Sequence, residues 1–283
     1  MGPSGIGKSL IVVDLCKHFY FNVISVDSTS IYKYMDIGTA KPTKKELDFV
    51  NYFLINILDP KEKYSVAEFY FDSLKIIENS FVNNKISLFV GGTMMYFWVL
   101  KNGLYLFNFS EEKKLYFYKK FLSFNSLFFD EYSYYYRKSI NSYFLFSNVM
   151  NKHKIFNSLI NYDIISIIIV PNTKETLFDK IEIRLSQMFK LGFLEEVNNL
   201  YLRGDLSSNM QSIKSIGYRQ IWNYLSGNIS LCDAKKDIFC STKLLVKRQL
   251  TWLKKWNKYT YVFFESDKNL LDKIKYVISG NGI

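Results

Sequence analysis

The stretch G2-P3-S4-G5-I6-G7-K8-S9 decides the fold. It fits the pattern G-x-x-x-x-G-K-[ST], in which backbone amides close around phosphate oxygens, the lysine neutralises charge, and the hydroxyl binds Mg²⁺. A loop of this kind normally follows a buried strand, whereas this sequence opens at Met1. We expect either that the true start lies upstream or that the sheet lacks a central strand, and we favour the first.

The residues after the loop alternate between helix-like and strand-like patterns, which predicts an α/β domain with a parallel sheet. Ser65 and Glu68 form a capping box of the S-x-x-E type at the start of one helix. The continuous apolar run Ile86–Val90 predicts a buried central strand. The expected elements are a helix over Lys8–Phe19, a strand over Phe21–Val26, a helix from Ser65 to about Asn79, the strand Ile86–Val90, and a helix from Thr93.

The texture changes from about Leu104 to Asn161, where aromatic residues are dense and glycine and proline are absent. This segment indicates a helical insertion. After it we expect a strand over Ile164–Val170, helices over Thr173–Leu191, Phe193–Arg203, Ile216–Leu225 and Asp233–Trp256, and a strand over Tyr259–Phe264. The predicted fold is a P-loop NTPase-like parallel sheet flanked by helices, with core residues 1–104 and 162–283 and a helical insertion domain at 105–161.

Composition narrows the possible function classes. No apolar run approaches the roughly 18 residues of a membrane-spanning helix, and no leader precedes the loop, so we expect a cytoplasmic monomer with no membrane partner. Cys16, Cys232 and Cys240 form no CxxC pair, so we expect neither a zinc site nor a disulfide framework. The net charge of +11 suits a polyanionic partner, but AT-rich codon drift explains it equally well.

The loop alone does not say which phosphate is bound. Nucleotide hydrolases and most kinases of this class place a carboxylate at the end of another core strand to hold the Mg²⁺ shell. Here the strand Ile86–Val90 ends in Gly91, Gly92 and Thr93. The well-placed strand-end carboxylate is Asp27, which serves either chemistry or a local turn.

Longer motifs lie on both sides of the insertion. They are I24-S25-V26-D27-S28, I31 to T43 (IYKYMDIGTAKPT), L58-D59-P60, Y64-S65-V66-A67, V90-G91-G92-T93-M94-M95-Y96-F97, S212 to Q220 (SIKSIGYRQ), and K247-R248-Q249-L250-T251-W252. Together they resemble the tRNA dimethylallyltransferase family, also called tRNA isopentenyltransferase. The resemblance covers essentially the whole chain.

The resemblance implies transfer of a five-carbon allylic group from dimethylallyl diphosphate to the exocyclic nitrogen of the adenosine 3′ of the tRNA anticodon. An exocyclic adenine amine is a poor nucleophile, so a carboxylate that accepts its proton helps, and Asp27 is the candidate. Departure of diphosphate calls for positive groups and aligned donors. The implied catalytic residues are Asp27, Thr93, Lys8 and Arg219.

The same resemblance implies two sets of binding residues. For the diphosphate they are the loop residues Gly2, Pro3, Ser4, Gly5, Ile6, Gly7, Lys8 and Ser9, with Mg²⁺ near Ser9. Lys180 and Arg184 are four residues apart and share a helix face. They either point into the diphosphate site, as the resemblance implies, or are simply solvated. For the anticodon stem-loop of tRNA they are Asp27, Ser28, Thr29, Ser30, Thr93, Lys114, Arg137, Lys138, Lys214, Ser215, Ile216, Gly217, Tyr218 and Arg219.

The sequence also departs from the family pattern. Tyr52, Phe53 and Asn56 stand where histidine and aspartate are usual, and Lys214 and Lys243 replace arginine, which loses the bidentate fork. The insertion is shortened. Two alternatives therefore remain: a small-molecule or nucleotide kinase that uses ATP at the loop, and a catalytically eroded tRNA-binding protein.

Overall fold

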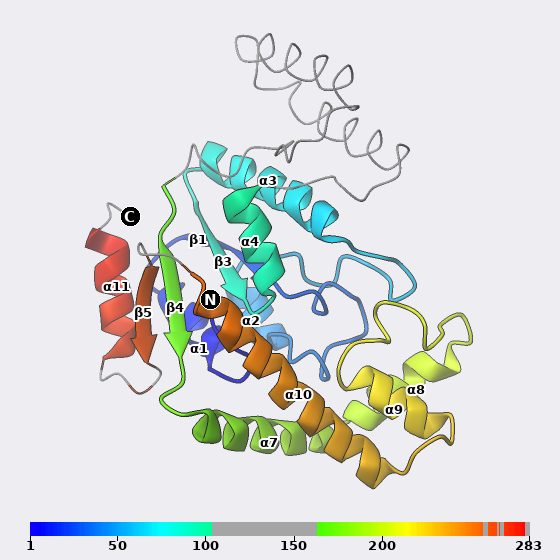
Figure 1. The fold of residues 1–283 in the computed structure, drawn as a ribbon. Helices are drawn as coiled ribbons and strands as arrows, with labels where there is room; N and C mark the ends of the chain where they lie inside the picture. The colour runs from blue at the N-terminus through cyan, green and yellow to red at the C-terminus, as the bar shows by residue number, and fades with distance from the viewer. Residues whose placement is uncertain (104–162, 257–259, 265, 267–268, 281–283) are drawn as a thin grey trace, which may run out of the picture.

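The computed structural model describes every residue except 104–162, 257–259, 265, 267–268 and 281–283. The expected insertion, with Lys114, Arg137 and Lys138, lies outside the described residues. The described chain forms parallel strands with helices packed around them (Figure 1).

The first sheet has three parallel strands in the order β2 (Tyr52–Phe53), β1 (Phe21–Val26) and β3 (Ile86–Gly91). Phe21 pairs with Ile86, and Val26 pairs with Gly91. Every residue of β1 is buried, as expected of a strand covered on both faces. The bounds predicted for β1 and the stop of β3 at the glycine pair are confirmed.

The second sheet pairs β4 (Ser166–Val170) in parallel with β5 (Thr260–Phe264). Among the described residues β3 therefore pairs with β1 alone and β4 with β5 alone. The prediction that β3 is a buried central strand is wrong, because Ile86–Val90 are only half-buried. One side of this strand borders an apolar cavity, and within the described part of the chain no further strand pairs with it there.

The helices of the described chain are α1 (Lys8–Leu15), α2 (Lys44–Phe49), α3 (Val66–Val82), α4 (Met94–Asn102), α7 (Lys174–Lys190), α8 (Phe193–Leu202), α9 (Tyr218–Leu225), α10 (Leu231–Leu253) and α11 (Leu270–Gly280). Helix α1 ends four residues before Phe19, where the amides of Lys17 and His18 bond three residues back, to Asp14 and Leu15, in the tighter 3₁₀ pattern. Helix α9 starts two residues after Ile216, because Gly217 has a φ of +95° and serves as the N-cap residue.

Two capping boxes fix helix starts in the first sheet's half of the chain. The Ser65 hydroxyl accepts from the Glu68 amide, and the Glu68 carboxylate accepts from the Ser65 amide at 2.6 Å. Thr43 and Glu46 make the same exchange at the start of α2. This second box was visible in the sequence, yet α2 was not predicted; nor were β2 and α11.

Strand β1 contributes to two apolar cores, because alternate side chains point to opposite faces. Ile24 and Val26 pack in the larger core with α3, α4, α8 and α9. Phe21 and Val23 pack in the smaller core with α1, α7 and α11. No helix within the described chain is long and apolar enough to cross a membrane.

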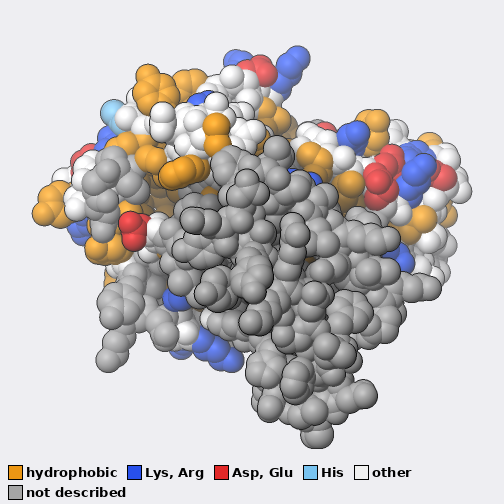
Figure 2. Space-filling view, turned by 90° about the horizontal axis from the view of Figure 1, so that it is seen from above, with side chains coloured by type: hydrophobic (Ala, Val, Ile, Leu, Met, Phe, Trp, Pro, Cys, Tyr) orange, Lys and Arg blue, Asp and Glu red, His pale blue; other side chains and the backbone are white. Residues whose placement is uncertain are grey.

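The basic side chains behind the net charge of +11 do not form one continuous patch on the described part of the face shown in Figure 2. On the described part of that face basic, acidic and hydrophobic side chains are interspersed. Elsewhere in the described chain Arg203 pairs with Asp59 at 3.0 Å and with Asp205 at 2.8 Å. The described part of this face therefore does not by itself indicate a nucleic-acid surface.

Candidate active site

A cavity of about 640 Å³ lies where the phosphate loop, the ends of β1 and β3, helices α7 and α10, and residues 211–217 meet. We term it the Asp27 cavity. Among the described residues that line it, Asp27 is the one carboxylate, and Arg184, Lys214 and Arg248 are the cations. The carboxyl ends of parallel strands are the usual place for a ligand in α/β folds.

The phosphate loop bends through two glycines in the left-handed region, Gly5 at a φ of +84° and Gly7 at +91°. Only glycine adopts this conformation without strain. Ser4 and Gly5 line the Asp27 cavity, whereas Gly2, Pro3, Ile6, Gly7 and Ser9 do not. Gly7 caps α1, and Ser9 is exposed in the first turn of that helix.

The Lys8 ammonium is folded under the loop. Its Nζ donates to the carbonyl oxygens of Gly2 at 2.9 Å and Pro3 at 2.7 Å. Burial lowers the Lys8 pKa to about 8, while the Asp27 carboxylate raises it and the Arg184 guanidinium lowers it. Lys8 is therefore within electrostatic reach of both charged groups of the Asp27 cavity.

Asp27 follows the last residue of β1 and is held by a local turn. Its Oδ1 accepts from the Thr29 amide at 2.8 Å and the Thr29 hydroxyl at 2.6 Å. The turn role considered from the sequence is therefore real. It also fixes the carboxylate at the cavity wall, where Oδ2 has no hydrogen-bond partner among the described residues.

Thr93 lines the same cavity as Asp27 and stands at the N-cap position of α4. Its hydroxyl accepts from the Ser28 amide at 3.2 Å. This bond ties the turn after β1 to the turn after β3. Two of the predicted catalytic residues, Asp27 and Thr93, therefore meet in one place.

Gln249 of α10 bridges the phosphate loop and the turn after β3. Its Oε1 accepts from the Ser4 amide at 2.9 Å, and its Nε2 donates to the Gly92 carbonyl at 2.9 Å. A Cβ on Gly92 would lie 2.6 Å from that Nε2. Glycine at position 92 thus permits the close approach that positions the loop.

The three cations come from different elements: Arg184 from α7, Lys214 from the segment before α9, and Arg248 from α10. Burial lowers the pKa of Arg184, and the nearby Asp27 carboxylate opposes that effect. Cations that converge on one cavity favour an anion with several oxygens, since charge-assisted hydrogen bonds are the strong ones.

Apolar side chains line the cavity beside the charged groups, on the same two helices as Arg184 and Arg248. Ile181, Leu185 and Met188 come from α7, and Ile238 and Leu245 come from α10. Residues three and four apart share a helix face, so the three side chains of α7 lie together. A ligand with a charged end and a short hydrocarbon end fits this lining.

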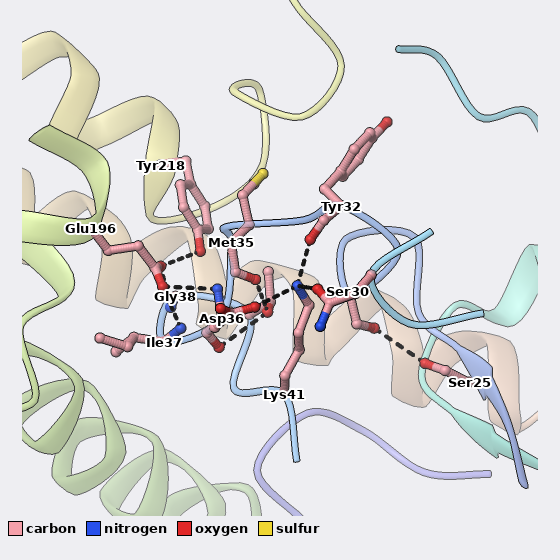
Figure 3. A network of polar contacts seen from close by, with 12 residues as sticks. Ser25, Ser30, Tyr32, Met35, Asp36, Ile37, Gly38, Lys41, Glu196 and Tyr218 are labelled. Atoms are coloured by element: carbon pink, nitrogen blue, oxygen red, sulfur yellow. Dashed lines mark hydrogen bonds and ion pairs between the residues drawn. The ribbon is translucent and has the colours of Figure 1, made fainter. Parts of the chain in front are cut away.

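The rim of the cavity is held by Glu196 of α8, as Figure 3 shows. Its Oε2 accepts from the amides of Asp36 at 2.8 Å and Ile37 at 2.7 Å. Its Oε1 accepts from the Gly38 amide at 3.0 Å and the Tyr218 hydroxyl at 2.5 Å. Since Gly38 lines the cavity, this carboxylate sets the position of the rim.

Lys41 closes the same loop from inside. Its Nζ donates to Asp36 Oδ1 at 2.8 Å, to Asn56 Oδ1 at 2.6 Å and to the Tyr32 carbonyl (Figure 3). Burial lowers the pKa of Lys41, and the Asp36 carboxylate opposes that effect. The loop around Asp36–Gly38 is therefore held from α8 by Glu196 and from within by Lys41.

The structure separates the predicted site residues into three groups. Those that line the Asp27 cavity are Ser4, Gly5, Asp27, Ser28, Thr29, Thr93, Arg184, Lys214, Ser215, Ile216 and Gly217. Those outside it are the loop residues Gly2, Pro3, Ile6, Gly7, Lys8 and Ser9, the buried residues Ser30 and Tyr218, and the exposed residues Lys180 and Arg219. Lys114, Arg137 and Lys138 lie outside the described residues.

The residues that sequence reasoning missed are mainly on α10. Arg248, Gln249 and Trp252 line the cavity with Leu245, at positions three, four and seven residues along the helix. That spacing puts them on one face. The motif K247–W252 contained the signal, but no site role was assigned to it. Gly38 and Thr39, also missed, lie in the motif I31–T43.

The IPP transferase family model matches residues 30–122 and 135–256, which together exceed half of the chain. The chain belongs to the IPP transferase family. This assignment confirms the resemblance drawn from the motifs. The match includes Asp36–Gly38, Thr93, Arg184, Lys214 and Gln249.

Relatives of this IPP transferase agree over its full length. It is 39% identical over 308 residues to the tRNA dimethylallyltransferase of Buchnera aphidicola subsp. Baizongia pistaciae (strain Bp), covering 99% of this chain and 93% of the relative. It is 34% identical over 307 residues to the tRNA dimethylallyltransferase of Coxiella burnetii (strain CbuG_Q212), covering 100% of both.

Solved structures of the family share the fold. The full-length tRNA isopentenylpyrophosphate transferase of Bacillus halodurans superposes with a TM-score of 0.75 at 28% identity, covering 99% of this chain and 94% of that one. A eukaryotic dimethylallyltransferase described as acting on tRNA superposes with a TM-score of 0.75 at 21% identity, covering 99% and 77%. The predicted α/β fold class is thereby confirmed.

Proposed function

We propose that this IPP transferase moves a dimethylallyl group from dimethylallyl diphosphate to N6 of the adenosine 3′-adjacent to the anticodon in tRNAs, releasing diphosphate. The observation that carries the proposal is the Asp27 cavity, where the described residues bring one carboxylate, three cations and apolar side chains of α7 and α10 together. The names of the relatives, tRNA dimethylallyltransferase, supply the substrates.

Asp27 acts as the general base in this proposal. The N6 nitrogen attacks the allylic carbon, the N6–carbon bond forms, and the carbon–oxygen bond breaks with its electron pair leaving on diphosphate. The N6 proton passes to Asp27 Oδ2, which has no other partner among the described residues. Thr29 holds Oδ1, so the carboxylate needs no reorientation. A base placed this way contributes about 10²–10⁴-fold.

The diphosphate leaves towards positive charge. Ser4 and Gly5 of the phosphate loop line the Asp27 cavity. Arg184, Lys214 and Arg248 line the same cavity and supply its positive charge. Lys8 adds a cation beneath the loop once its ammonium turns from the carbonyls of Gly2 and Pro3. Groups already in place where charge develops are usually the largest catalytic contribution.

Mg²⁺ fits beside the loop as the metal of this reaction. The Ser9 hydroxyl is exposed in the first turn of α1, and hydroxyl and diphosphate oxygens are the hard ligands that Mg²⁺ prefers. Among the described residues no group of three or more His, Cys, Asp or Glu side chains forms a metal site. Bound there, the ion would neutralise diphosphate charge.

The adenine enters between Asp27 and Thr93 after turning out of the anticodon loop, as enzymes that modify bases require. Ser28, Thr29 and residues 214–217 line its path. Arg219 is exposed at the start of α9, so we assign it to the tRNA phosphates and no longer to the leaving group. The protein acts as a cytoplasmic monomer in this proposal.

The kinase alternative has less support from the site. Strand β3 ends in Gly91, Gly92 and Thr93, and Asp27 is the one carboxylate that lines the cavity. A kinase of this class uses a second strand-end carboxylate for its Mg²⁺. The eroded-enzyme alternative would leave Asp27, Thr93 and the three cations together without a use.

The test is transfer of label. The purified protein is incubated with dimethylallyl diphosphate carrying radiolabel in the allylic carbons and with unmodified tRNA. We expect label in the tRNA and one diphosphate released per transfer. Turnover of ATP without dimethylallyl diphosphate would instead support the kinase. Binding of tRNA without transfer of label would support the eroded protein.

A further inference from the structure

The two segments that meet in the Asp27 cavity have different tasks in the proposed reaction. Ser4 and Gly5 belong to the phosphate loop, which holds the departing diphosphate. Asp27 and Thr93 belong to the turns after β1 and β3, where the adenine enters. Transfer requires the attacking nitrogen and the allylic carbon to lie about 3–3.5 Å apart. The placement of the loop relative to the two turns therefore affects the rate.

The turns after β1 and β3 are joined to each other by hydrogen bonds. The amides of Gly92 and Thr93 donate to the Val26 carbonyl at 3.2 and 3.1 Å. The Ser28 amide donates to the Thr93 hydroxyl at 3.2 Å. Because Asp27 lies between Val26 and Ser28, these bonds fix the proposed base relative to the turn after β3.

Gln249 of α10 joins the phosphate loop to these turns. Its Oε1 accepts from the Ser4 amide and its Nε2 donates to the Gly92 carbonyl, each at 2.9 Å. The same Nε2 lies 3.4 Å from the Ser4 hydroxyl. Gln249 is only 5% exposed, so these bonds form away from water. One side chain therefore reaches both the part that holds diphosphate and the part that holds the base.

The two contacts of Gln249 require a primary amide. The Ser4 N–H needs an acceptor and the Gly92 carbonyl needs a donor, and a glutamine side chain carries both. The reversed orientation would set the NH₂ against an N–H and the oxygen against a carbonyl, so the network fixes the orientation. An apolar side chain would satisfy neither backbone group, which is costly in a buried place.

We infer that Gln249 is a positioning residue for the transfer step, which holds the phosphate loop at the distance from Asp27 that attack by N6 requires. The inference rests on the proposed function. Gln249 acts through backbone groups of the loop and the turn, so its loss should slow transfer and leave the affinity for each substrate nearly unchanged. A misplacement of about 1 Å costs roughly 10²-fold in rate.

A matched glutamine separates positioning from structural support. Gln220 of α9 is 4% exposed, accepts from the Gly217 amide at 2.9 Å and donates to the Ser241 hydroxyl at 3.1 Å. Both partners of its amide lie outside the phosphate loop and the turns after β1 and β3. Gln249→Met and Gln220→Met therefore remove comparable buried hydrogen bonds, and the first alone releases the loop.

Single-turnover transfer tests the inference, with enzyme in excess over tRNA and dimethylallyl diphosphate saturating. Its rate constant does not depend on the fraction of folded protein. We expect Gln249→Met to transfer roughly 10²-fold more slowly than the wild type, with its Kd for each substrate nearly unchanged, and Gln220→Met to transfer at close to the wild-type rate. A wild-type rate in Gln249→Met, or an equal loss in Gln220→Met, would overturn the inference.

Gly92→Ala reaches the same contact from the other side. Gly92 lies outside the left-handed region, so alanine adds no backbone strain, but its Cβ would lie 2.6 Å from Gln249 Nε2. We expect Gly92→Ala to slow transfer as well, and to slow it far less when Gln249 is already methionine. Additive losses in the double variant would show that the two residues act separately and would contradict the inference.

Hydrogen exchange of the Ser4 amide in the free proteins, measured by NMR, needs no transfer activity. Gln249→Met should exchange this amide roughly tenfold faster or more, and Gln220→Met should not. Unchanged protection would show that Gln249 does not hold the loop, which would overturn the inference alone. A wild type that transfers nothing would contradict the proposed function, and the inference with it.

Discussion

The Asp27 cavity and the apolar cavity between Ile86–Val90 of β3 and residues 163–167 both include residues of the phosphate loop and differ in chemistry. Asp27, Arg184, Lys214 and Arg248 line the first, whereas mainly aliphatic side chains line the second. Lys8 links the two, because its side chain lines the apolar cavity while Asp27 and Arg184 of the Asp27 cavity affect its pKa. Charged groups can select a ligand in the Asp27 cavity, whereas the lining of the apolar cavity offers mainly hydrophobic contact.

The largest effect should come from the one carboxylate that distinguishes the Asp27 cavity. Asp27→Asn keeps an oxygen for the Thr29 amide but cannot accept the N6 proton. We expect kcat to fall about 10²–10⁴-fold while the Kd for tRNA stays within about twofold, by filter binding. Asp14→Asn, which affects only an exposed ion pair with Lys17 on α1, is the matched control. Equal losses in kcat and affinity would contradict the role of a base.

The next effect separates the cationic wall of the cavity from the helix surface beside it. Arg184 lines the Asp27 cavity, and Lys180, one turn earlier, is exposed. Loss of a charge-assisted interaction costs about 1.5–3 kcal/mol, so Arg184→Gln should lower kcat/KM for dimethylallyl diphosphate roughly 10- to 150-fold. Lys180→Gln should change it far less. Similar losses would show that both residues bind diphosphate.

A smaller effect tests Lys8, which lines the apolar cavity and whose pKa depends on Asp27 and Arg184 of the Asp27 cavity. Its pKa is about 8 in the free protein, so the ammonium is present at pH 7 and loses its proton as the pH rises to 9. We expect kcat/KM for dimethylallyl diphosphate to fall about tenfold between pH 7 and pH 9, since this ratio reports the free enzyme. Bound diphosphate raises the pKa, so kcat falls at higher pH.

Lys8→Arg provides the control for this profile, because arginine stays charged throughout the range. Any activity that this variant keeps should be flat between pH 7 and pH 9. A wild-type profile that is flat to pH 10 would mean that the Lys8 ammonium does not serve diphosphate binding.

The smallest effect concerns the rim and falls on stability. Glu196→Gln replaces a carboxylate that accepts from three amides and the Tyr218 hydroxyl, and places an NH₂ against at least one of these donors. We expect a loss of about 1–3 kcal/mol and a Tm lower by roughly 2–10 °C. Exposed Glu195→Gln should leave the Tm unchanged. Equal Tm values of the wild type and Glu196→Gln in calorimetry would contradict the role of Glu196 in stabilising the rim.

The sequence predicted the strand ends that build the cavity, because local signals mark them. Gly91 and Gly92 stop β3, and Asp27 follows β1 directly. Likewise Ser65 and Glu68 marked the start of α3 at the residue observed. Local sequence patterns are therefore sufficient to place Asp27 and Thr93 at the ends of their strands.

Tertiary relations could not be predicted in the same way. No local pattern says that Glu196 binds amides 158 to 160 residues earlier in the chain, or that Gln249 reaches Ser4. Lys180 and Arg184 share a helix face, but only packing decides that Arg184 enters the cavity. The apolar run Ile86–Val90 predicted a buried strand, but it could not reveal the apolar cavity that borders this strand.

The most direct test of the account is mass spectrometry of tRNA nucleosides after incubation with dimethylallyl diphosphate and the wild-type protein or Asp27→Asn. The account predicts N6-isopentenyladenosine in the wild-type sample, mapped by nuclease digestion to the position 3′ of the anticodon, and almost none with the variant. Absence of the modified nucleoside from the wild-type sample, with tRNA binding intact, would contradict the central claim.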